Sequence, residues 1–217
     1  MESFVIIGLG RFGSTVAEEL CALGHQVLAI DINESAVQRM ADKVTQAVAG
    51  DCRDPEVLET LGVRHTQCAV VAFSSDIGAS VLITLNLKEL GIPRLICKAR
   101  SASHEELLRR IGADLVVFPE QESGRSLART LDNREILGYI PLAEGYSIVK
   151  TLIPLHWQGK TPAEVDLLKH HRISLVAVQG EDGTLRTAPP ADYVFRPGDQ
   201  IFTLGRNEDN NRLIALE

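Results

Sequence analysis

Short apolar runs alternate with amphipathic segments along the first 131 residues of the chain. The apolar runs are rich in β-branched residues and predict strands at residues 4–7, 26–30, 45–49, 68–72, 95–98 and 115–118. Between them, apolar residues recur at helical spacing and predict helices at residues 11–23, 34–41, 55–61, 77–90, 104–111 and 120–131. Several of these helices are followed by a glycine, which is a frequent C-terminal stop: Gly24, Gly62, Gly91 and Gly112.

The predicted strands are apolar on both faces, so helices must cover both sides of the sheet that they form. Single strands that alternate with helices predict a parallel, doubly wound sheet. Right-handed crossovers then give it a Rossmann-like topology. We therefore expect a nucleotide-binding α/β domain that spans residues 1–137.

The alternation changes after Leu137. Strands are predicted at residues 146–153 and 173–178 and around Thr184 and Ile201, with a short helix at 162–170 and a last helix at 209–214. Turn signals in the segments EDG (181–183) and RPGD (196–199) join neighbouring strands through tight connections. Residues 138–217 are thus expected to form a small antiparallel α+β domain, which needs a neighbour or a second copy to fold stably.

The composition excludes several classes of protein. With 217 residues, 45% of them hydrophobic and 24% charged, the chain can bury a core and is not disordered. Its net charge of −7 repels phosphate backbones, so we do not expect nucleic acid as a partner. No apolar run approaches the roughly 20 residues that cross a bilayer, and the N-terminal segment lacks the features of a signal peptide. We therefore expect a cytoplasmic protein.

The four cysteines are predicted to be reduced thiols. They lie far apart in the sequence, without a CxxC pair or a histidine at zinc-site spacing. They are Cys21, Cys52, Cys68 and Cys97.

A glycine-rich turn follows the first predicted strand. It reads GLGRFG from Gly8 to Gly13, the G-x-G-x-x-G pattern, in which Gly10 lets the backbone approach a pyrophosphate and the following helix N-terminus attracts the anion. Asp31 ends the second strand, where a carboxylate can bind ribose hydroxyls and disfavours the 2′-phosphate of NADP. The turn lacks the lysine of a Walker loop, since Ser14 follows Gly13. The alternative to nucleotide binding is that Gly8 to Gly13 form only a compact strand-to-helix turn and that Asp31 is only a surface acid.

Arg11 adds a positive charge inside this turn. A charge-assisted hydrogen bond contributes on the order of 1.5 to 3 kcal/mol, and an extra arginine suits ATP or ADP better than NAD, whose two phosphates the helix terminus already meets. The alternative is that Arg11 points into solvent or pairs with Glu18.

Polar residues also follow other strands at their carboxyl ends, where open α/β sheets bind ligands. They are Asn33, Asp51, Cys52, Ser74, Ser75, Asp76, Lys98 and Arg100. The alternatives are local: the SSD segment (74–76) and Asp51 could each cap the next helix, and Lys98 and Arg100 could be surface charges. Glu120 and Glu122 lie in a first helical turn, where acids favour the helix dipole regardless of function.

Catalysis is not indicated by the sequence. The six histidines show no spacing that places one of them beside an acid and a nucleophile. A small NAD-linked oxidoreductase remains the alternative function. A nucleotide-binding domain fused to a small partner domain is otherwise typical of a sensor.

Six segments of the chain together resemble a known family. They are VIIGLGRFG, LAIDIN, AGDCRDPEVLETLGV, NLKELGIPRLICKAR, LRRIGADLVVFPEQESG and FRPGDQIFTLG. In this order, and over nearly the whole chain, they resemble the regulatory gating subunits of bacterial potassium transporters, the KtrA/TrkA type built on RCK domains. Of the two types, this sequence resembles the KtrA-like form more closely, which has one N-terminal and one C-terminal RCK domain per chain.

The resemblance implies a function that composition does not show. Such subunits are not enzymes; they form octameric rings on the cytoplasmic face of a membrane potassium-translocating subunit of the KtrB/TrkH type. They bind ATP or ADP, or NAD(H) in some relatives, and change ring shape with the nucleotide. The C-terminal domain of some relatives binds cyclic di-AMP, but Leu168 stands where that site would have an arginine, which argues against this ligand here.

The resemblance also implies roles for individual residues. Arg11 would lie beside the terminal phosphate, Asp31 and Asn33 would hold the ribose, and Glu120 would lie at a dimer interface where some members bind a divalent cation. Asp51 and Cys52 would line the adenine, and Lys98 and Arg100 would lie near phosphates. The complete predicted nucleotide site is Gly8, Gly10, Arg11, Phe12, Gly13, Asp31, Ile32, Asn33, Asp51, Cys52, Ser74, Ser75, Lys98 and Arg100.

Overall fold

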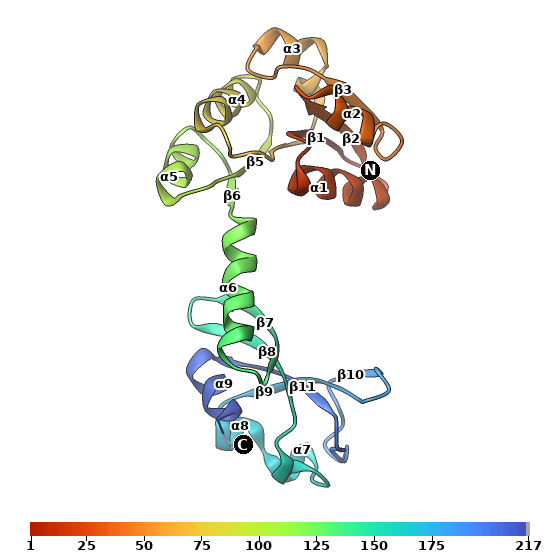
Figure 1. The fold of residues 1–217 in the computed structure, drawn as a ribbon, viewed down its shortest axis with the longest axis vertical. Helices are drawn as coiled ribbons and strands as arrows, with labels where there is room; N and C mark the ends of the chain where they lie inside the picture. Colours follow the sequence, from red (N-terminus) through yellow and green to blue (C-terminus); the bar gives the residue numbers. More distant parts are fainter. Residues whose placement is uncertain (216–217) are drawn as a thin grey trace. The chain divides into compact units, whose positions relative to one another are not determined.

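The computed structural model of the protein describes residues 1–215. The chain forms two compact units, Met1–Pro119 and Glu120–Glu217 (Figure 1). The sequence pattern places the domain boundary at residue 137 instead. The difference is the helix α6 (Pro119–Asp132) and the loop after it, which the structure groups with the second unit. The boundary at residue 137 stays a prediction.

The first unit contains a six-stranded parallel sheet with strand order β3-β2-β1-β4-β5-β6. Its strands are β1 (Ser3–Ile7), β2 (Gln26–Asp31), β3 (Gln46–Ala49), β4 (Cys68–Val71), β5 (Arg94–Lys98) and β6 (Leu115–Val117). Each predicted strand is present to within about one residue at either end. In the centre, Val5 of β1 is in register with Leu28 on one side and Ala69 on the other.

Helices cover both faces of this sheet, as the apolar strands require (Figure 1). They are α1 (Arg11–Ala22), α2 (Glu34–Met40), α3 (Pro55–Thr60), α4 (Ile77–Glu89) and α5 (Ala102–Arg110), with the 3₁₀ turn η1 (Val63–His65). One face packs on α3, α4 and α5 through Val5, Ile7, Leu58, Ile83 and Leu108. The other packs on α1 and α2 through Ile6, Ala17 and Met40. The predicted Rossmann-like fold is confirmed.

The strand order reverses between β1 and β4. From β1 the chain runs outward to β2 and β3, and it then crosses back through α3 to β4 on the opposite side of β1. Ligands of open α/β sheets bind beyond the carboxyl ends of the strands at such a reversal. The glycine turn after β1 lies at this point of the fold.

The second unit contains a five-stranded antiparallel sheet with strand order β10-β9-β11-β8-β7. Its strands are β7 (Ile136–Ala143), β8 (Tyr146–Leu152), β9 (Ser174–Gln179), β10 (Leu185–Thr187) and β11 (Gln200–Arg206). The remaining elements are α6, η2 (Leu155–Trp157), α7 (Pro162–Val165), α8 (Leu167–His171) and α9 (Asn207–Ile214). The small antiparallel α+β architecture predicted for the C-terminal part is confirmed.

Two elements of this unit differ from the prediction. β7 was not predicted, because Gly138 and Pro141 weaken the strand signal; the sheet tolerates both since β7 is an edge strand. The helix predicted at 162–170 is two short helices. Asp166 breaks it with φ of +43°, and its side chain caps the second helix by accepting from the backbone N–H of Lys169.

Candidate functional site

The glycine turn after β1 is held close to its neighbours. The backbone N–H of Gly8 donates to the carbonyl of Ile30 in β2 at 2.8 Å. At Gly13, a Cβ atom would lie 1.9 Å from the carbonyl oxygen of Gly8, so only glycine fits there. At Gly10, a Cβ atom would meet nothing within 4 Å among the described residues. The turn therefore has open space beside Gly10 and is tightly packed at Gly13.

Helix α1 begins at Arg11, inside the glycine motif. Its N-cap residue is Gly10, and no side chain of the described chain caps the helix. The first N–H groups of a helix have no partner within it, and they carry the positive end of the helix dipole. The turn therefore offers an anion the donors and the field that bind a phosphate.

Asp31, at the end of β2, stabilises the turn through two hydrogen bonds. Its Oδ2 accepts from the backbone N–H of Leu9 at 2.6 Å, and its Oδ1 accepts from the backbone N–H of Asn33 at 2.8 Å. A carboxylate has about four lone-pair sites, so Asp31 retains capacity to accept from ribose hydroxyls. Asn33 uses its side-chain oxygen to cap α2, accepting from the backbone N–H of Ser35 and of Ala36.

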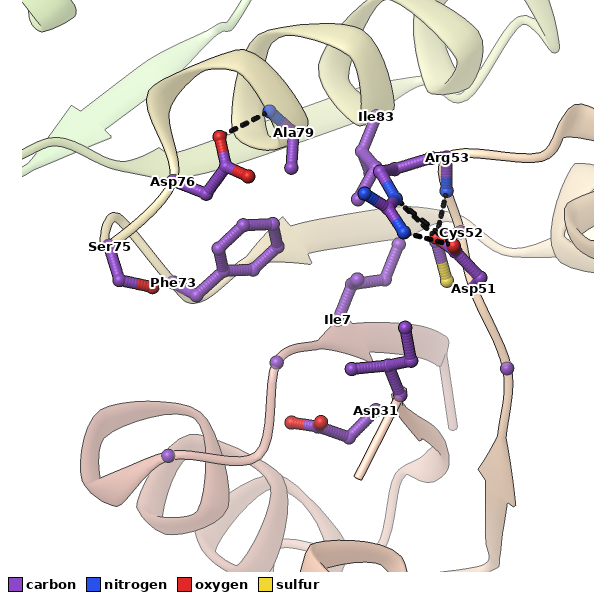
Figure 2. Close-up of a pocket in the computed structure, with 14 residues that line it drawn as sticks. Ile7, Asp31, Asp51, Cys52, Arg53, Phe73, Ser75, Asp76, Ala79 and Ile83 are labelled. Carbon is purple, nitrogen blue, oxygen red and sulfur yellow. Dashed lines mark hydrogen bonds and ion pairs between the residues drawn. The ribbon is translucent and has the colours of Figure 1, made fainter. Parts of the chain in front are cut away.

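A pocket of about 320 Å³ opens beside the turn, at the carboxyl ends of the strands (Figure 2). Part of the predicted site lines it: Gly8, Gly10, Asp31, Ile32, Asp51, Cys52 and Ser75. The other lining residues are not part of the site predicted from the sequence, although Asp76 was among the polar candidates: Ile7, Gly50, Arg53, Phe73, Asp76, Ala79 and Ile83. The apolar members among them carry no polar signal in the sequence, whereas the charge of Arg53, two residues after Asp51, could have indicated it.

Asp51 and Arg53 form an ion pair at the pocket, as Figure 2 shows. The Nη2 of Arg53 lies 2.6 Å from Oδ2 of Asp51, and the Nε lies 2.9 Å from Oδ1. These hydrogen bonds from Arg53 lower the pKa of Asp51 below its ordinary value. The alternative that Asp51 caps the next helix is wrong, because Asp54 is the N-cap of α3 and accepts from the backbone N–H of Glu56.

The floor of the pocket is largely apolar. The Cys52 thiol is only 3% exposed and packs in the same hydrophobic cluster as Ile83. Burial, followed by the charges of Asp51 and Asp31, raises the pKa of this thiol to about 12. Cys52 therefore lines the pocket as an uncharged thiol at physiological pH. All four cysteines are free thiols.

Several predicted site residues do not line the pocket: Arg11, Phe12, Gly13, Asn33, Ser74, Lys98 and Arg100. Lys98 lies 5.8 Å from the centre of the Phe12 ring, so these two residues lie together beside the turn. The guanidinium of Arg100 donates to the backbone carbonyl of Ser75 at 3.3 Å, which ties the loop after β5 to the loop after β4.

Arg11 lies at the first position of α1 and is exposed. The alternative pairing with Glu18 is wrong, since Glu18 accepts from Nζ of Lys43 at 2.8 Å. Within residues 1–215, Arg11 makes no ion pair.

For the SSD segment, the alternative of a helix cap is confirmed. Asp76 caps α4, because its Oδ1 accepts from the backbone N–H of Ala79 at 3.0 Å.

Glu120 lies in the first turn of α6, at the start of the second unit. Over the described residues, no group of three or more histidine, cysteine, aspartate or glutamate side chains could hold a metal ion. The role of Glu120 toward a cation stays a prediction.

No helix in the described part of the chain is long and apolar enough to span a membrane.

Residues 4–119 match the model of the family described as the TrkA-N domain. The chain is 35% identical over 211 residues to the Ktr system potassium uptake protein A of Bacillus subtilis (strain 168), a match that covers 97% of this chain and 95% of that protein.

Solved structures agree with these matches. The crystal structure of the GsuK RCK domain matches 100% of this chain and 47% of its own, with 26% identity and a TM-score of 0.58. The GsuK channel bound to NAD matches 100% of this chain and 39% of its own, with 25% identity and a TM-score of 0.57. This chain therefore spans less than half the length of both GsuK chains.

Proposed function

Because the chain belongs to the TrkA-N domain family, and resembles a Ktr potassium uptake protein over nearly its whole length, we propose that it is a nucleotide-binding regulatory subunit of a membrane potassium transporter. It acts in the cytoplasm and reaches the membrane through a potassium-translocating partner of the KtrB/TrkH type. It works by binding a ligand rather than by catalysis.

One observation carries the proposal. An uncapped helix N-terminus, an open glycine turn and the carboxylate of Asp31 meet at one pocket, at the point where the strand order reverses. Phosphate at the helix terminus and ribose at the carboxylate place a nucleotide across the turn. The apolar floor around Cys52 and Ile83 suits the face of a base.

ATP and ADP are the nucleotides that we propose. Arg11 starts α1, beside the phosphate-binding turn, and its exposed guanidinium can reach a terminal phosphate. In an octameric ring, Arg11 of one subunit would also lie near the phosphates bound by its neighbour. The GsuK channel bound to NAD supports a dinucleotide as the second candidate ligand.

Gating then follows from differential binding. A nucleotide shifts a conformational equilibrium only if it binds one state more tightly than the other. The third phosphate of ATP adds a contact with Arg11 that ADP lacks, and so favours one ring geometry over another. A divalent cation at Glu120 would act at an interface between subunits of that ring.

Isothermal titration of the full chain with ATP, ADP, AMP and NADH tests the proposal. ATP and ADP should bind, and Arg11→Ala should weaken ATP more than ADP, by about tenfold for the loss of one charge-assisted bond. Arg129→Ala, a change in the last turn of α6 in the second unit, is the control. Failure of all four nucleotides to bind would refute the nucleotide site, and equal losses for ATP and ADP would refute the role of Arg11.

A further inference from the structure

The strand order indicates how a nucleotide would lie in the pocket. Phosphates belong at the N-terminus of α1, and the ribose belongs at Asp31, where β2 ends. β3 is the strand beyond β2, so the loop after β3 lies on the far side of the ribose from the phosphates. The base would therefore lie beside this loop, where Asp51, Cys52 and Arg53 line the pocket.

The carboxylate of Asp51 is already occupied by Arg53. Its Oδ1 accepts from the backbone N–H of Arg53 at 3.0 Å and from Nε at 2.9 Å. Its Oδ2 accepts from Nε at 3.0 Å and from Nη2 at 2.6 Å. Since a carboxylate has about four lone-pair sites, Asp51 has little capacity left to accept from the amino group of adenine.

Arg53, in contrast, keeps hydrogen-bond donors for a ligand. A guanidinium carries five N–H groups, and the contacts with Asp51 use those on Nε and one on Nη2. In the described structure, Nη1 and the second N–H of Nη2 have no hydrogen-bond partner. The side chain is 50% exposed, and it lies on the pocket wall in Figure 2.

The position of these donors is fixed from two directions. The fork of Arg53 lies against Asp51, and the backbone carbonyl of Arg53 accepts from Nδ2 of Asn86 in α4 at 3.0 Å. Asp76 also lines the pocket and adds negative charge near Arg53, but its Oδ1 caps α4. The free edge of Arg53 is thus held as a donor surface at the base end of the pocket.

Purine bases differ at the edge that such a donor surface would meet. Guanine and hypoxanthine present two acceptors, O6 and N7, which match the arginine fork; adenine presents the acceptor N7 beside the donor N6. We propose that Arg53 contacts the base and extends this pocket to 6-oxopurine nucleotides, by donating to their O6 and N7. The inference rests on the nucleotide site of the proposed function and names a further class of ligand for it.

Titration of the full chain with ADP, GDP and IDP tests the inference. IDP shares O6 and N7 with GDP but lacks its 2-amino group, so the pair isolates the effect of the 6-oxo edge. Wild type should bind IDP and GDP at least as tightly as ADP. Arg53→Met should weaken IDP and GDP by about tenfold relative to ADP, the usual discrimination of a bidentate arginine contact.

Arg64→Met is the matched control. Arg64 also forms an exposed ion pair, with Glu59 at 3.6 Å, but it does not line the pocket, so its loss should leave all three affinities unchanged. The inference is overturned if wild type binds ADP more tightly than IDP and GDP, or if Arg53→Met changes all three affinities equally. Absence of binding by all three nucleotides would overturn the proposed site itself, and this inference with it.

Discussion

Gly13 and Gly8 approach so closely that a Cβ atom on Gly13 would lie 1.9 Å from the carbonyl oxygen of Gly8. This contact seats the first turn of α1 directly against the end of β1. Gly10, between them in sequence, borders open space instead. The three glycines of one motif thus serve different ends: two make the turn compact, and one keeps its outer side clear.

Gly13→Ala should destabilise the first unit. The added methyl group meets backbone atoms that cannot rotate away, and overpacking of this kind costs about 1 to 3 kcal/mol or more. Urea unfolding of the full chain measures the loss. Gly78→Ala in α4 is the matched control, because its Cβ atom would be 3.4 Å from Asp76 and alanine favours a helix. Equal stability of the two variants would contradict the expected crowding.

Gly10→Ala should separate folding from binding. Gly10 has a φ of −73°, which alanine adopts freely, and its Cβ atom would meet nothing within 4 Å in the described structure. The free energy of unfolding should therefore change by less than about 1 kcal/mol. ADP should bind much more weakly, because the methyl group occupies the space that a pyrophosphate needs. Undiminished ADP affinity by calorimetry would show that phosphate does not approach here.

Asp31→Ala should reduce both stability and nucleotide affinity. Without the carboxylate, the backbone N–H groups of Leu9 and Asn33 lose their acceptor, and the loss at the partly buried N–H of Leu9 costs about 1 to 3 kcal/mol. The thermal midpoint without nucleotide reports the structural part, and titration with ADP reports the ligand part. Asp42→Ala, at an exposed position between α2 and β3, should change neither quantity. An unchanged midpoint for Asp31→Ala would refute the fastening role of Asp31.

His104 should make the chain less stable in mild acid. The side chain is 2% exposed, and neither ring nitrogen has a hydrogen-bond partner among the described residues. Burial, followed by the charge of Arg100, lowers the pKa of His104 below its ordinary value of 6.5. The unfolded chain therefore binds the proton first as the pH falls. Stability is retained above pH 6.5 and is lost from there down to the lower pKa of the folded state.

Denaturant unfolding at several pH values checks this effect. The slope from His104 should not exceed about 1.4 kcal/mol per pH unit below pH 6.5. His104→Leu removes the titration and should flatten the slope relative to wild type. The comparison isolates His104 from His171, whose pKa is also lowered, by burial and by the neighbouring His170 and His156. Identical slopes for the two proteins would rule out His104 as the source.

The sequence predicted part of the pocket lining at both ends of the candidate site, with Asp51 and Cys52 at the base end. Gly8, Gly10 and Asp31 were identified because their spacing along one strand, turn and helix is a local pattern, and all three line the pocket. Arg53 was missed, since its place on the pocket wall depends on how the loop after β3 meets α4. Arg11 lies at the first position of α1 and does not line the pocket, so its role toward a phosphate stays a prediction.

What the sequence determined by itself is the order of strands and helices in the first unit and the glycines that end the helices. These follow from the periodicity of apolar residues and from positive φ angles, such as +86° at Gly24, which act over a few residues. Only the tertiary structure decided that Gly138 and Pro141 lie in an edge strand, that Asp166 breaks a helix, and that Arg53 forms an ion pair with Asp51. The edge position of β7 depends on which strands pair, and strand pairing joins separate segments. The cap of Asp166 and the ion pair of Arg53 join residues only three and two positions apart, but the same residue types are compatible with several backbone conformations, and the folded structure selects one of them.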